Sequence, residues 1–444
     1  MPKPIFSLNF DGTAVITDDG REVSYAQLKN LTEEWAAKVP PRSLAFLLVG
    51  NNLDSLIAYI ACLNYGVVPL MLDARIDASL LQRFLDIYDP DYIWKPSTDG
   101  AYELETRKSR RVIVLYPDLA LLLTTSGSTG SPKLVRQSYR NIRANTASIV
   151  EYLRLDATER PITTLPMNYT YGLSIINSHL AVGATILLTE KSIMQREFWN
   201  FFSEQSATSF GGVPYTYEML DKLMFFRRKL PSLRTMTQAG GKILPELHRK
   251  FAEYAQREGK NFVVMYGQAE ATARMSYLPP GRALDKVGSM GIVIPGGRFE
   301  LVDGELVYYG DNVTLGYAEC AGDLAKGDER HGKLVTGDMA RVDEEGFYYI
   351  VGRKKRFLKI FGNRVNLDET ERLIKGEFRD IDCACGGVDD KMRIFITDEE
   401  QMQAVRDFVA EKTHLNFTAF DVRFLATIPK NASGKTLYSE LPVS

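Results

Sequence analysis

A stretch rich in serine, threonine and glycine follows one of the most apolar runs of the chain. It reads TTSGSTGSPK, from Thr124 to Lys133, and comes directly after the apolar residues 120–123. Glycine lets a backbone approach a ligand closely and turn successive N–H groups toward it, and hydroxyls add donors that suit phosphate oxygens. Lys133 adds a positive charge that can screen a polyphosphate. We therefore expect a phosphate-binding loop rather than a flexible linker, since a linker seldom lies between a buried strand and a helix.

Two acidic residues farther along the chain also lie near glycines. Glu270 belongs to YGQAEAT, residues 266–272, which follows the apolar run FVVM. A carboxylate at the carboxyl end of such a strand lies where α/β proteins bind ligands, and next to phosphates it most often holds Mg²⁺. Asp338 belongs to VTGDMA and could accept both hydroxyls of a ribose. Taken alone, Glu270 could equally be a surface residue, and Asp338 could cap a turn.

A Gly-Lys pair near the end of the chain lies in PKNASGKT, residues 429–436. It is not a Walker A loop, because that motif needs a glycine where this chain has Pro429. Only eight residues follow Thr436, which is too few for the helix and strand of a βαβ unit. We therefore expect Lys435 to serve a different chemistry, as a compact charge on a flexible stem.

Composition limits the class of protein. The chain has 444 residues, of which 45% are apolar and 25% charged, as in ordinary globular proteins of several domains. A net charge of −2 argues against a dedicated nucleic-acid binder. No apolar run reaches the length of a membrane helix, and the N-terminus lacks the apolar region of a signal peptide. The one close cysteine pair, Cys383 and Cys385, has poor spacing for zinc. We expect a reduced, cytoplasmic protein without a membrane span.

The elements that must position these residues change in kind along the chain. Before residue 300, short apolar runs alternate with amphipathic stretches, which indicates α/β layers with largely parallel sheets. The predicted strands are residues 43–50, 67–72, 162–166, 184–190 and 261–266, and the predicted helices are residues 24–38, 53–65, 139–154, 194–204 and 246–258. After residue 300, ELVDGELVYYG (300–310) alternates as a half-exposed antiparallel strand would, and a hairpin turn is expected at Glu345-Gly346.

Four adjacent cations, residues 353–356, mark a candidate boundary. They disfavour burial and suit an exposed connector, although a solvated strand end would fit as well. A compact α+β pattern follows them. We therefore place an N-terminal domain at residues 1–352, a hinge at 353–356 and a C-terminal domain at 357–444.

In this order, the stretches resemble the motifs of the adenylate-forming enzymes, which include acyl- and aryl-CoA synthetases, luciferases and the adenylation domains of peptide synthetases. VSYAQL (23–28) and LNYGVVPLMLD (63–73) resemble the first two structural motifs of that family, and the likeness covers nearly the whole chain. It implies an α/β fold: a large N-terminal domain of layered α/β subdomains with parallel-rich sheets plus a β-rich subdomain, and a small, mobile α+β C-terminal domain. It also implies ATP and Mg²⁺ as cofactors.

The resemblance assigns a nucleotide-binding set. The loop that holds the β- and γ-phosphates would comprise Thr125, Ser126, Gly127, Ser128, Thr129, Gly130 and Lys133. The remaining nucleotide contacts would be Tyr266 stacked on adenine beside Gly267, Glu270 on Mg²⁺, Asp338 on the ribose and a catalytic Arg353 on the nucleotide. Two positions depart from the family pattern. Leu134 stands where a glycine usually follows the lysine, and Ala269 replaces a threonine whose hydroxyl touches the α-phosphate, for which Thr272 could compensate in part.

The acyl pocket is implied by three stretches. LPMNYTYGLS (165–174) would place Tyr169 as an aromatic gate, with Tyr171 and Gly172 beside it, and GGVPYTYEML (211–220) would add Tyr215 and Tyr217. QAGGKIL (238–244) would flank adenine and the carboxylate through Gly240 and Gly241. Tyrosines with polar tips suit an aryl or medium-sized acyl group, although each could equally be core. The segment 165–174 lacks the aspartate that binds an α-ammonium group, so an amino-acid-adenylating ligase is the less favoured alternative.

The C-terminal domain would serve both halves of the reaction. Lys435 would be the catalytic lysine when the substrate carboxylate attacks the α-phosphorus of ATP. The domain would then rotate about Lys355 and present Lys359, Gly362 and Arg364 to the acceptor thiol. The acceptor would be CoA or the phosphopantetheine of a carrier protein on a separate chain, because no carrier domain follows Lys435. A non-catalytic adenylate sensor, suggested by Ala269 and Leu134, is the alternative of another class.

Overall fold

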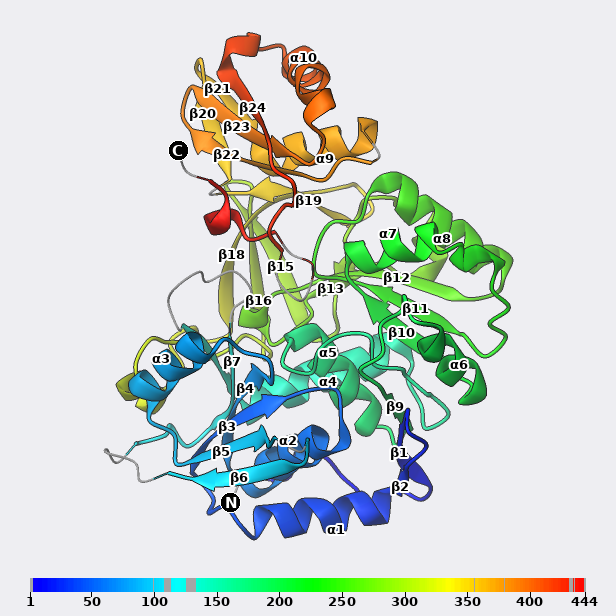
Figure 1. Cartoon of the computed structure of the whole chain (residues 1–444), viewed down its shortest axis with the longest axis vertical. Coiled ribbons are helices and arrows are strands. Elements are labelled where there is room, and N and C mark those ends of the chain that lie inside the picture. Colours follow the sequence, from blue (N-terminus) through cyan, green and yellow to red (C-terminus); the bar gives the residue numbers. More distant parts are fainter. Residues whose placement is uncertain are drawn as a thin grey trace.

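The computed structural model describes residues 3–98, 100–107, 113–124, 133–354, 356–378, 380–430, 434 and 436–442. Figure 1 shows these residues as a large body of helices and sheets with a smaller unit, formed by β20 and the elements after it, at one end. The predicted α/β class is confirmed, with antiparallel sheets confined mainly to the second half of the chain.

A mixed seven-stranded sheet forms the N-terminal part of the body, in the order β17-β8-β7-β4-β3-β5-β6. Its strands are β3 Leu44–Val49, β4 Val68–Asp73, β5 Tyr92–Pro96, β6 Tyr102–Thr106, β7 Leu119–Thr124, β8 Leu134–Ser138 and β17 Gly316–Ala318. Every residue of β3 is buried, and alternate residues enter different clusters: Leu47 lies on the side of α2, and Phe46 on the side of α3. A strand covered on both faces reads as a continuous apolar run, which explains LAFLLV. The helices of this part are α1 Tyr25–Ala36, α2 Leu53–Tyr65, α3 Ala78–Tyr88 and α4 Tyr139–Leu153.

A second sheet carries most of the candidate site. Its parallel strands are β10 Ser209–Gly212, β11 Thr235–Gln238 and β12 Asn261–Tyr266, and the antiparallel strands β13 Ser276–Tyr277 and β14 Ile292–Val293 extend it. The helices of this part are α5 Thr170–Leu180, α6 Arg196–Glu204, α7 Pro214–Lys222 and α8 Pro245–Arg257. A small sheet joins the two parts through β1 Thr13–Thr17, β2 Glu22–Ser24 and β9 Ile186–Leu188. The strands β10, β11 and β12 end at one sheet edge, which brings segments far apart in sequence together.

The antiparallel part contains one correction. Residues 300–310 do not form a single strand, because Asp303 and Gly304 have φ values of 51° and 78° and turn the chain between β15 Gly297–Val302 and β16 Glu305–Gly310. An Asp-Gly pair favours this two-residue hairpin. The strands β18 Lys333–Val342 and β19 Tyr348–Arg353 complete the sheet, and the predicted turn at Glu345-Gly346 lies between them.

The predicted strand at residues 162–166 is also wrong. Ile162 makes an isolated bridge to Leu187, and the N–H of Thr163 donates to the carbonyl of Leu187 at 2.9 Å, but residues 164–166 belong to no strand. The hydroxyl of Thr163 donates to the carbonyl of Thr189 at 2.9 Å, and Pro166 has no N–H for a ladder. The other predicted strands and helices named above match observed elements within a few residues.

The C-terminal unit has its own core. It consists of β20 Phe357–Ile360, β21 Asn363–Asn366, α9 Leu367–Glu377, β22 Cys383–Val388, β23 Lys391–Ile396, α10 Met402–Thr413 and β24 Phe420–Phe424. β19 ends at Arg353 in the sheet of the body, and β20 begins at Phe357 in the next unit. The hinge at 353–356 stays a prediction, and Lys355 lies outside the described residues.

Cys383 and Cys385 lie buried in β22 as free thiols. Burial raises the pKa of both thiols. Among the residues that the structure describes, no group of three or more histidine, cysteine, aspartate or glutamate side chains could hold a metal ion. Within the same residues, no helix has the length and apolar character needed to cross a membrane.

The buried His248 predicts an acid limb of stability. Its Nε2 donates to the carbonyl of Ala283 at 2.9 Å, and its Nδ1 faces the N–H of Gly288 at 3.4 Å, an arrangement that requires a neutral ring. Burial lowers the pKa of His248 from 6.5 to about 4. The unfolded chain therefore binds this proton below pH ~6.5, and the folded chain binds it only near pH 4. As the pH decreases from 6.5 to 4, the free energy of unfolding decreases by up to about 3 kcal/mol.

We expect the difference in unfolding free energy between pH 7 and pH 5, measured by urea titration, to be smaller in His248→Gln than in the wild type. His179, whose pKa burial also lowers to about 4, remains in the variant and supplies a residual slope. An unchanged difference in unfolding free energy between the two pH values would contradict the assignment to His248.

Candidate active site

Glycines allow close packing at the common edge of β10, β11 and β12. Gly240 follows β11 with φ 84°, and a Cβ atom on it would lie 2.6 Å from the hydroxyl of Tyr169. Gly267 follows β12, and a Cβ atom there would lie 1.7 Å from the carbonyl oxygen of Ala273. Neither position accepts a side chain without a shift of its neighbours. Gly241 packs on Pro214, which begins α7 after β10. The three predicted glycines thus shape one edge.

Asp338 and Tyr266 meet directly at this edge. The hydroxyl of Tyr266 donates to Oδ2 of Asp338 at 2.5 Å, and Nε2 of Gln268 donates to the same oxygen at 2.8 Å. Asp338 is only 5% exposed, and burial raises the pKa of its carboxyl group. Nε of Arg353 lies 3.6 Å from Oδ1, because Asp338 and Arg353 are paired across β18 and β19. The carboxylate of Asp338 can accept hydrogen bonds from ribose hydroxyls, and the neighbouring guanidinium of Arg353 suits a phosphate.

Glu270 lies in a second polar group of the same edge. It belongs to the 3₁₀ turn Ala269–Ala271, and its Oε1 accepts a hydrogen bond from the hydroxyl of Tyr317 at 2.7 Å. The ammonium group of Lys133 lies 3.7 Å from the centre of the Tyr317 ring, and the guanidinium of Arg330 lies 4.6 Å from it. Within the described part of the chain, no hydrogen bond reaches Oε2 of Glu270. One open carboxylate oxygen next to two cations fits a Mg²⁺ ion shared with phosphates, since this ion usually takes one or two protein carboxylates.

Lys133 is the one member of the predicted phosphate loop that the structure describes. It directly precedes β8, and its ammonium group lies 3.5 Å from Glu319. Leu134, which replaces the usual glycine, is fully buried in β8 and packs in the core of the seven-stranded sheet. The predicted residues Thr125, Ser126, Gly127, Ser128, Thr129 and Gly130 lie outside the described residues.

Thr272 does not supply the hydroxyl that Ala269 lacks. Its hydroxyl donates to the carbonyl of Asn312 at 2.7 Å, and the residue is buried. The backbone at Thr272 has φ 66°, which turns the chain away from the 3₁₀ turn. The expected compensation is therefore not supported, because this hydroxyl already serves the packing of residue 312.

The four predicted pocket tyrosines occupy different environments. Tyr217 is fully buried, and its hydroxyl donates to the carbonyl of Thr237, so it belongs to the core. Tyr171 is also buried, and its hydroxyl donates to Oγ1 of Thr237 at 2.8 Å. Tyr169 is half-buried next to Gly240, and Tyr215 is 42% exposed. Tyr169 and Tyr215 are thus the two of the four that remain accessible.

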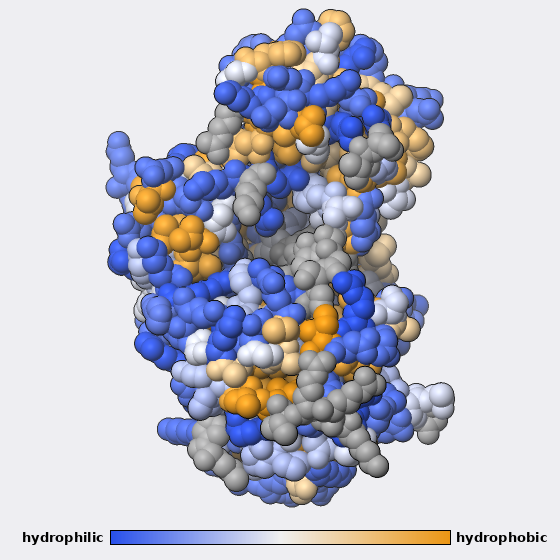
Figure 2. Space-filling model, turned by 90° about the vertical axis from the view of Figure 1, so that its left-hand side faces the viewer, coloured by the Kyte–Doolittle hydropathy of each residue, from blue (hydrophilic) through white to orange (hydrophobic). Residues whose placement is uncertain are grey.

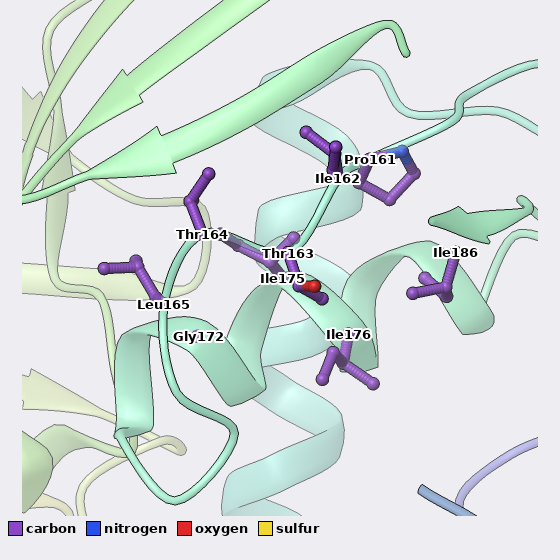
Figure 3. Close-up of a pocket in the computed structure, with 9 residues that line it drawn as sticks. All are labelled: Pro161, Ile162, Thr163, Thr164, Leu165, Gly172, Ile175, Ile176 and Ile186. Atoms are coloured by element: carbon purple, nitrogen blue, oxygen red, sulfur yellow. The ribbon is translucent and has the colours of Figure 1, made fainter. Parts of the chain in front are cut away.

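Gly172 takes part through its backbone. A Cβ atom on Gly172 would lie 2.4 Å from the carbonyl oxygen of Pro166, so a glycine lets α5 pack closely on the preceding segment. Figure 3 shows the small pocket that this packing leaves. It is lined by Pro161, Ile162, Thr163, Thr164, Leu165, Gly172, Ile175, Ile176 and Ile186.

The C-terminal unit reaches the same edge. A Cβ atom on Gly434 would lie 3.3 Å from Cβ of Tyr215, and the ammonium group of Lys430 lies 5.5 Å from the centre of the Tyr215 ring. Figure 2 shows the molecule hollowed between the C-terminal unit above and the body below, with hydrophilic residues around the hollow. Lys435 lies outside the described residues, and Gly434 and Lys430 are the residues that the structure places beside Tyr215.

A partly buried cluster connects the residues just after that segment to the predicted hinge. Arg356 forms ion pairs with Asp368 at 2.5 Å and with Glu371 at 2.6 Å, and its guanidinium lies 3.6 Å from the centre of the Tyr438 ring. The hydroxyl of Tyr438 donates to the second oxygen of Glu371 at 2.9 Å. Arg356 ends the predicted hinge, and Tyr438 follows the PKNASGKT segment by two residues, so this cluster holds the two together. We name it the Arg356 cluster.

The predicted thiol-side residues lie elsewhere on the C-terminal unit. Lys359 is exposed on β20, and Gly362, with φ 84°, turns the chain into β21. Arg364 lies on β21, and its side chain is outside the described part of the structure. These residues share one hairpin, which is separate from the 429–436 segment.

The family follows from comparison with known proteins. The sequence profile of the family described as AMP-binding enzyme matches residues 93–318, just over half of the chain. The chain belongs to the AMP-binding enzyme family. This confirms the resemblance to adenylate-forming enzymes. The matched residues include the phosphate loop and Glu270, whereas Asp338 and the C-terminal unit follow them.

Relatives of this AMP-binding enzyme cover most of its length. It is 27% identical over 421 residues to the indoleacetate–CoA ligase of Aromatoleum aromaticum, with 83% of this chain and 81% of the relative covered. It is 24% identical over 485 residues to the 2-succinylbenzoate–CoA ligase of Bacillus licheniformis, with 97% and 96% covered. The structure of o-succinylbenzoate CoA synthetase from Bacillus subtilis with its acyl-adenylate intermediate matches with a TM-score of 0.80 at 21% identity, over 98% of this chain and 96% of that chain. This likeness confirms the fold.

Three side chains of the site were not anticipated from the sequence of this AMP-binding enzyme. Gln268 lies within YGQAEAT and could have been suspected from its position between Tyr266 and Glu270. No motif in the sequence around Tyr317 or Arg330 indicated that these residues belong to the site. Tyr317 reaches Glu270 because β17 pairs with the edge of β8, some 180 residues earlier in the chain.

Proposed function

We propose that this enzyme uses ATP to activate a carboxylic acid as acyl-AMP, releases pyrophosphate, and transfers the acyl group to the thiol of CoA. The observation that supports this most is a pair of contacts in a chain of the AMP-binding family: Tyr266 bonds to Asp338, and Tyr317 joins Glu270 to Lys133. The two relatives named above are CoA ligases of acids that contain an aromatic ring. An aryl or medium-sized acyl acid is therefore the proposed substrate.

The residues have distinct proposed roles in the first step. The carboxylate of the substrate attacks the α-phosphorus, so two anions meet and negative charge must be stabilised on the oxygens around the phosphorus. Lys133 and Arg330 would face the phosphates, Asp338 would accept the ribose hydroxyls, and Arg353 would contact the nucleotide. Glu270 would hold Mg²⁺, which neutralises charge on the phosphates when it is bound. Positioning of the two reactants supplies much of the remaining acceleration.

The second step needs another arrangement of the C-terminal unit. Gly434 lies against Tyr215. In this proposal, the 429–436 segment would stand between an acyl-adenylate and an approaching thiol. We propose that rotation about Lys355 withdraws this segment and brings in the hairpin of Lys359, Gly362 and Arg364. The phosphopantetheine of a separate carrier protein is the alternative acceptor. A cytoplasmic location would suit a CoA-dependent reaction.

The test is carboxylate-dependent exchange of labelled pyrophosphate into ATP, with a panel of aryl, fatty and amino acids. We expect exchange with an aryl or medium-chain acid, and CoA thioester formation once CoA is added. Exchange with amino acids alone would replace this proposal by the amino-acid ligase. Absence of exchange with every acid would favour a non-catalytic sensor, for which Ala269 and the engaged hydroxyl of Thr272 are the supporting features.

A further inference from the structure

Arg274 is a buried cation close to the candidate site. It follows Glu270 by four residues and is only 2% exposed. Its Nε donates to Oγ of Ser174 at 3.2 Å, and its Nη1 lies 3.0 Å from the hydroxyl of Tyr152 and 3.2 Å from Sδ of Met265. The guanidinium also lies 5.1 Å from the centre of the Tyr171 ring. All of these partners are neutral.

No carboxylate among the described residues forms an ion pair with Arg274. Arg136, the other arginine that is deeply buried among the described residues, has charged and carbonyl partners. Arg136 forms an ion pair with Glu329 and donates to the carbonyl oxygens of Leu315, Tyr317, Lys326 and Gly327. A buried guanidinium stays protonated, and an unpaired buried charge is costly. Within the described residues, Nη2 of Arg274 has no hydrogen-bond acceptor. Arg274 therefore has one side of its guanidinium available for an acceptor that the described residues do not provide.

Arg274 lies beside the predicted acyl pocket, so the missing acceptor can come from the bound acid. Tyr171 and Met265 pack in one small cluster with Leu165, Val213, Ala239 and Val263, and Tyr152 and Tyr169 pack against it. We name this the acyl cluster, because it joins the three stretches expected to line the acyl pocket. Its outer members Tyr169 and Val213 face Gly240 and Gly434, at the mouth of the site. Arg274 contacts Tyr152, Tyr171 and Met265, so it lies at the inner side of the same cluster.

We propose that Arg274 determines substrate specificity, and that the acid carries an oxygen acceptor at the end opposite its reacting carboxylate. This inference rests on the proposed function. An acyl group that enters past Tyr169 and lies against the side chains of the acyl cluster would bring its far end to the guanidinium of Arg274. A carboxylate fits best, because it returns a negative charge to the buried cation and accepts from the planar fork. A phenol oxygen offers the same hydrogen-bond chemistry without the full charge.

The neighbouring polar groups do not remove the need for this acceptor. His179 lies close enough that the charge of Arg274 contributes to lowering its pKa, to about 4, after burial itself, so this ring is neutral. Oδ1 of Asn145, whose amide donates to the backbone carbonyl of Arg274, has no partner in the described structure. In the described part of the chain, the surroundings of Arg274 thus contain polar groups but no anion.

The experiment compares acids of matched size in pyrophosphate exchange. The probes are terephthalate, 4-hydroxybenzoate and 4-methylbenzoate, which share the ring, and adipate and heptanoate, which differ in the terminal group. We expect the wild-type enzyme to prefer an oxygen-bearing member at least about tenfold in kcat/KM over its methyl counterpart. In Arg274→Met, kcat/KM for that acid should fall about 10- to 100-fold and that for the methyl counterpart should not fall. Preference for terephthalate or adipate identifies a second carboxylate, and preference for 4-hydroxybenzoate identifies a phenol.

Two controls separate specificity from folding. Arg274→Lys keeps the charge without the fork and should give an intermediate preference, whereas Arg298→Met, at an exposed arginine of β15, should match the wild type. Equal losses for oxygen-bearing and methyl acids in Arg274→Met, with a lower thermal midpoint, would show a structural role and overturn the proposal.

Calorimetric titration of the same acids without ATP separates this inference from the proposed function. Binding of an oxygen-bearing acid that Arg274→Met abolishes, in an enzyme that shows no exchange, would support the inference and overturn the function. Exchange and binding without discrimination between the members of each pair would overturn the inference alone.

Discussion

Lys435→Ala should lower the rate of acyl-AMP formation about 10³-fold and leave the use of preformed acyl-AMP within about threefold of wild type. The first half-reaction brings a carboxylate to a triphosphate, and a positive charge between them stabilises the transition state more than the separate anions. The second half-reaction starts from a neutral carbonyl, which needs no such bridge. The position of Gly434 against Tyr215 supports this division, because Gly434 directly precedes Lys435 in the sequence.

The two half-reactions are measured separately for Lys435→Ala. Pyrophosphate exchange reports the first, and thioester formation from synthetic acyl-AMP and CoA reports the second. Lys430→Ala is the matched control in the same segment, since the ammonium group of Lys430 pairs with Asp382 at 2.5 Å. It should lower either rate less than about tenfold. Equal losses of rate in both half-reactions of Lys435→Ala would contradict the prediction that Lys435 acts only in acyl-AMP formation.

Continuous apolar runs and glycine-rich turns made most of the fold predictable. LAFLLV reads as a strand because both of its faces are covered, and TTSGSTGSPK reads as a phosphate loop because its composition is so unusual. The failure at residues 162–166 came from treating apolar content as sufficient, since the backbone pairing with Leu187 ends at Thr163 and Pro166 has no N–H for a ladder. The Asp303-Gly304 turn was readable but was taken as part of one strand.

The site was predictable where a motif carries its own chemistry. Asp338, Tyr266 and Glu270 each lie in a recognisable stretch, and the structure brings the first two into direct contact. Tyr317 was not predictable, because its role depends on the pairing of β17 with a distant strand edge. Arg274 was not predictable either, since an arginine in ATARM reads as exposed, and only packing among α4, α5 and β12 buries it.

Glu270→Gln should lower kcat/KM for pyrophosphate exchange about 10²- to 10³-fold and raise the Mg²⁺ concentration needed for half-maximal rate. The amide keeps the size of the side chain and can still accept the hydrogen bond of Tyr317, so the 3₁₀ turn and its anchors at Thr314 are retained. What is lost is the negative charge, which is the property that a Mg²⁺ ligand needs. The thermal midpoint should therefore change little.

Two variants test whether the loss in Glu270→Gln arises from the charge. Tyr317→Phe removes only the hydroxyl that orients Glu270, so it should lower the rate about tenfold and leave the Mg²⁺ dependence closer to that of the wild type. Glu319→Gln removes a nearby exposed carboxylate that lies 3.5 Å from Lys133, and it should have little effect on either quantity. If Glu270→Gln and Glu319→Gln behaved alike, with no change in Mg²⁺ dependence, the carboxylate of Glu270 would not be the metal ligand. The opposite ranking, with Tyr317→Phe as damaging as Glu270→Gln, would make orientation by Tyr317 the decisive property, because both variants would then lose the same geometry.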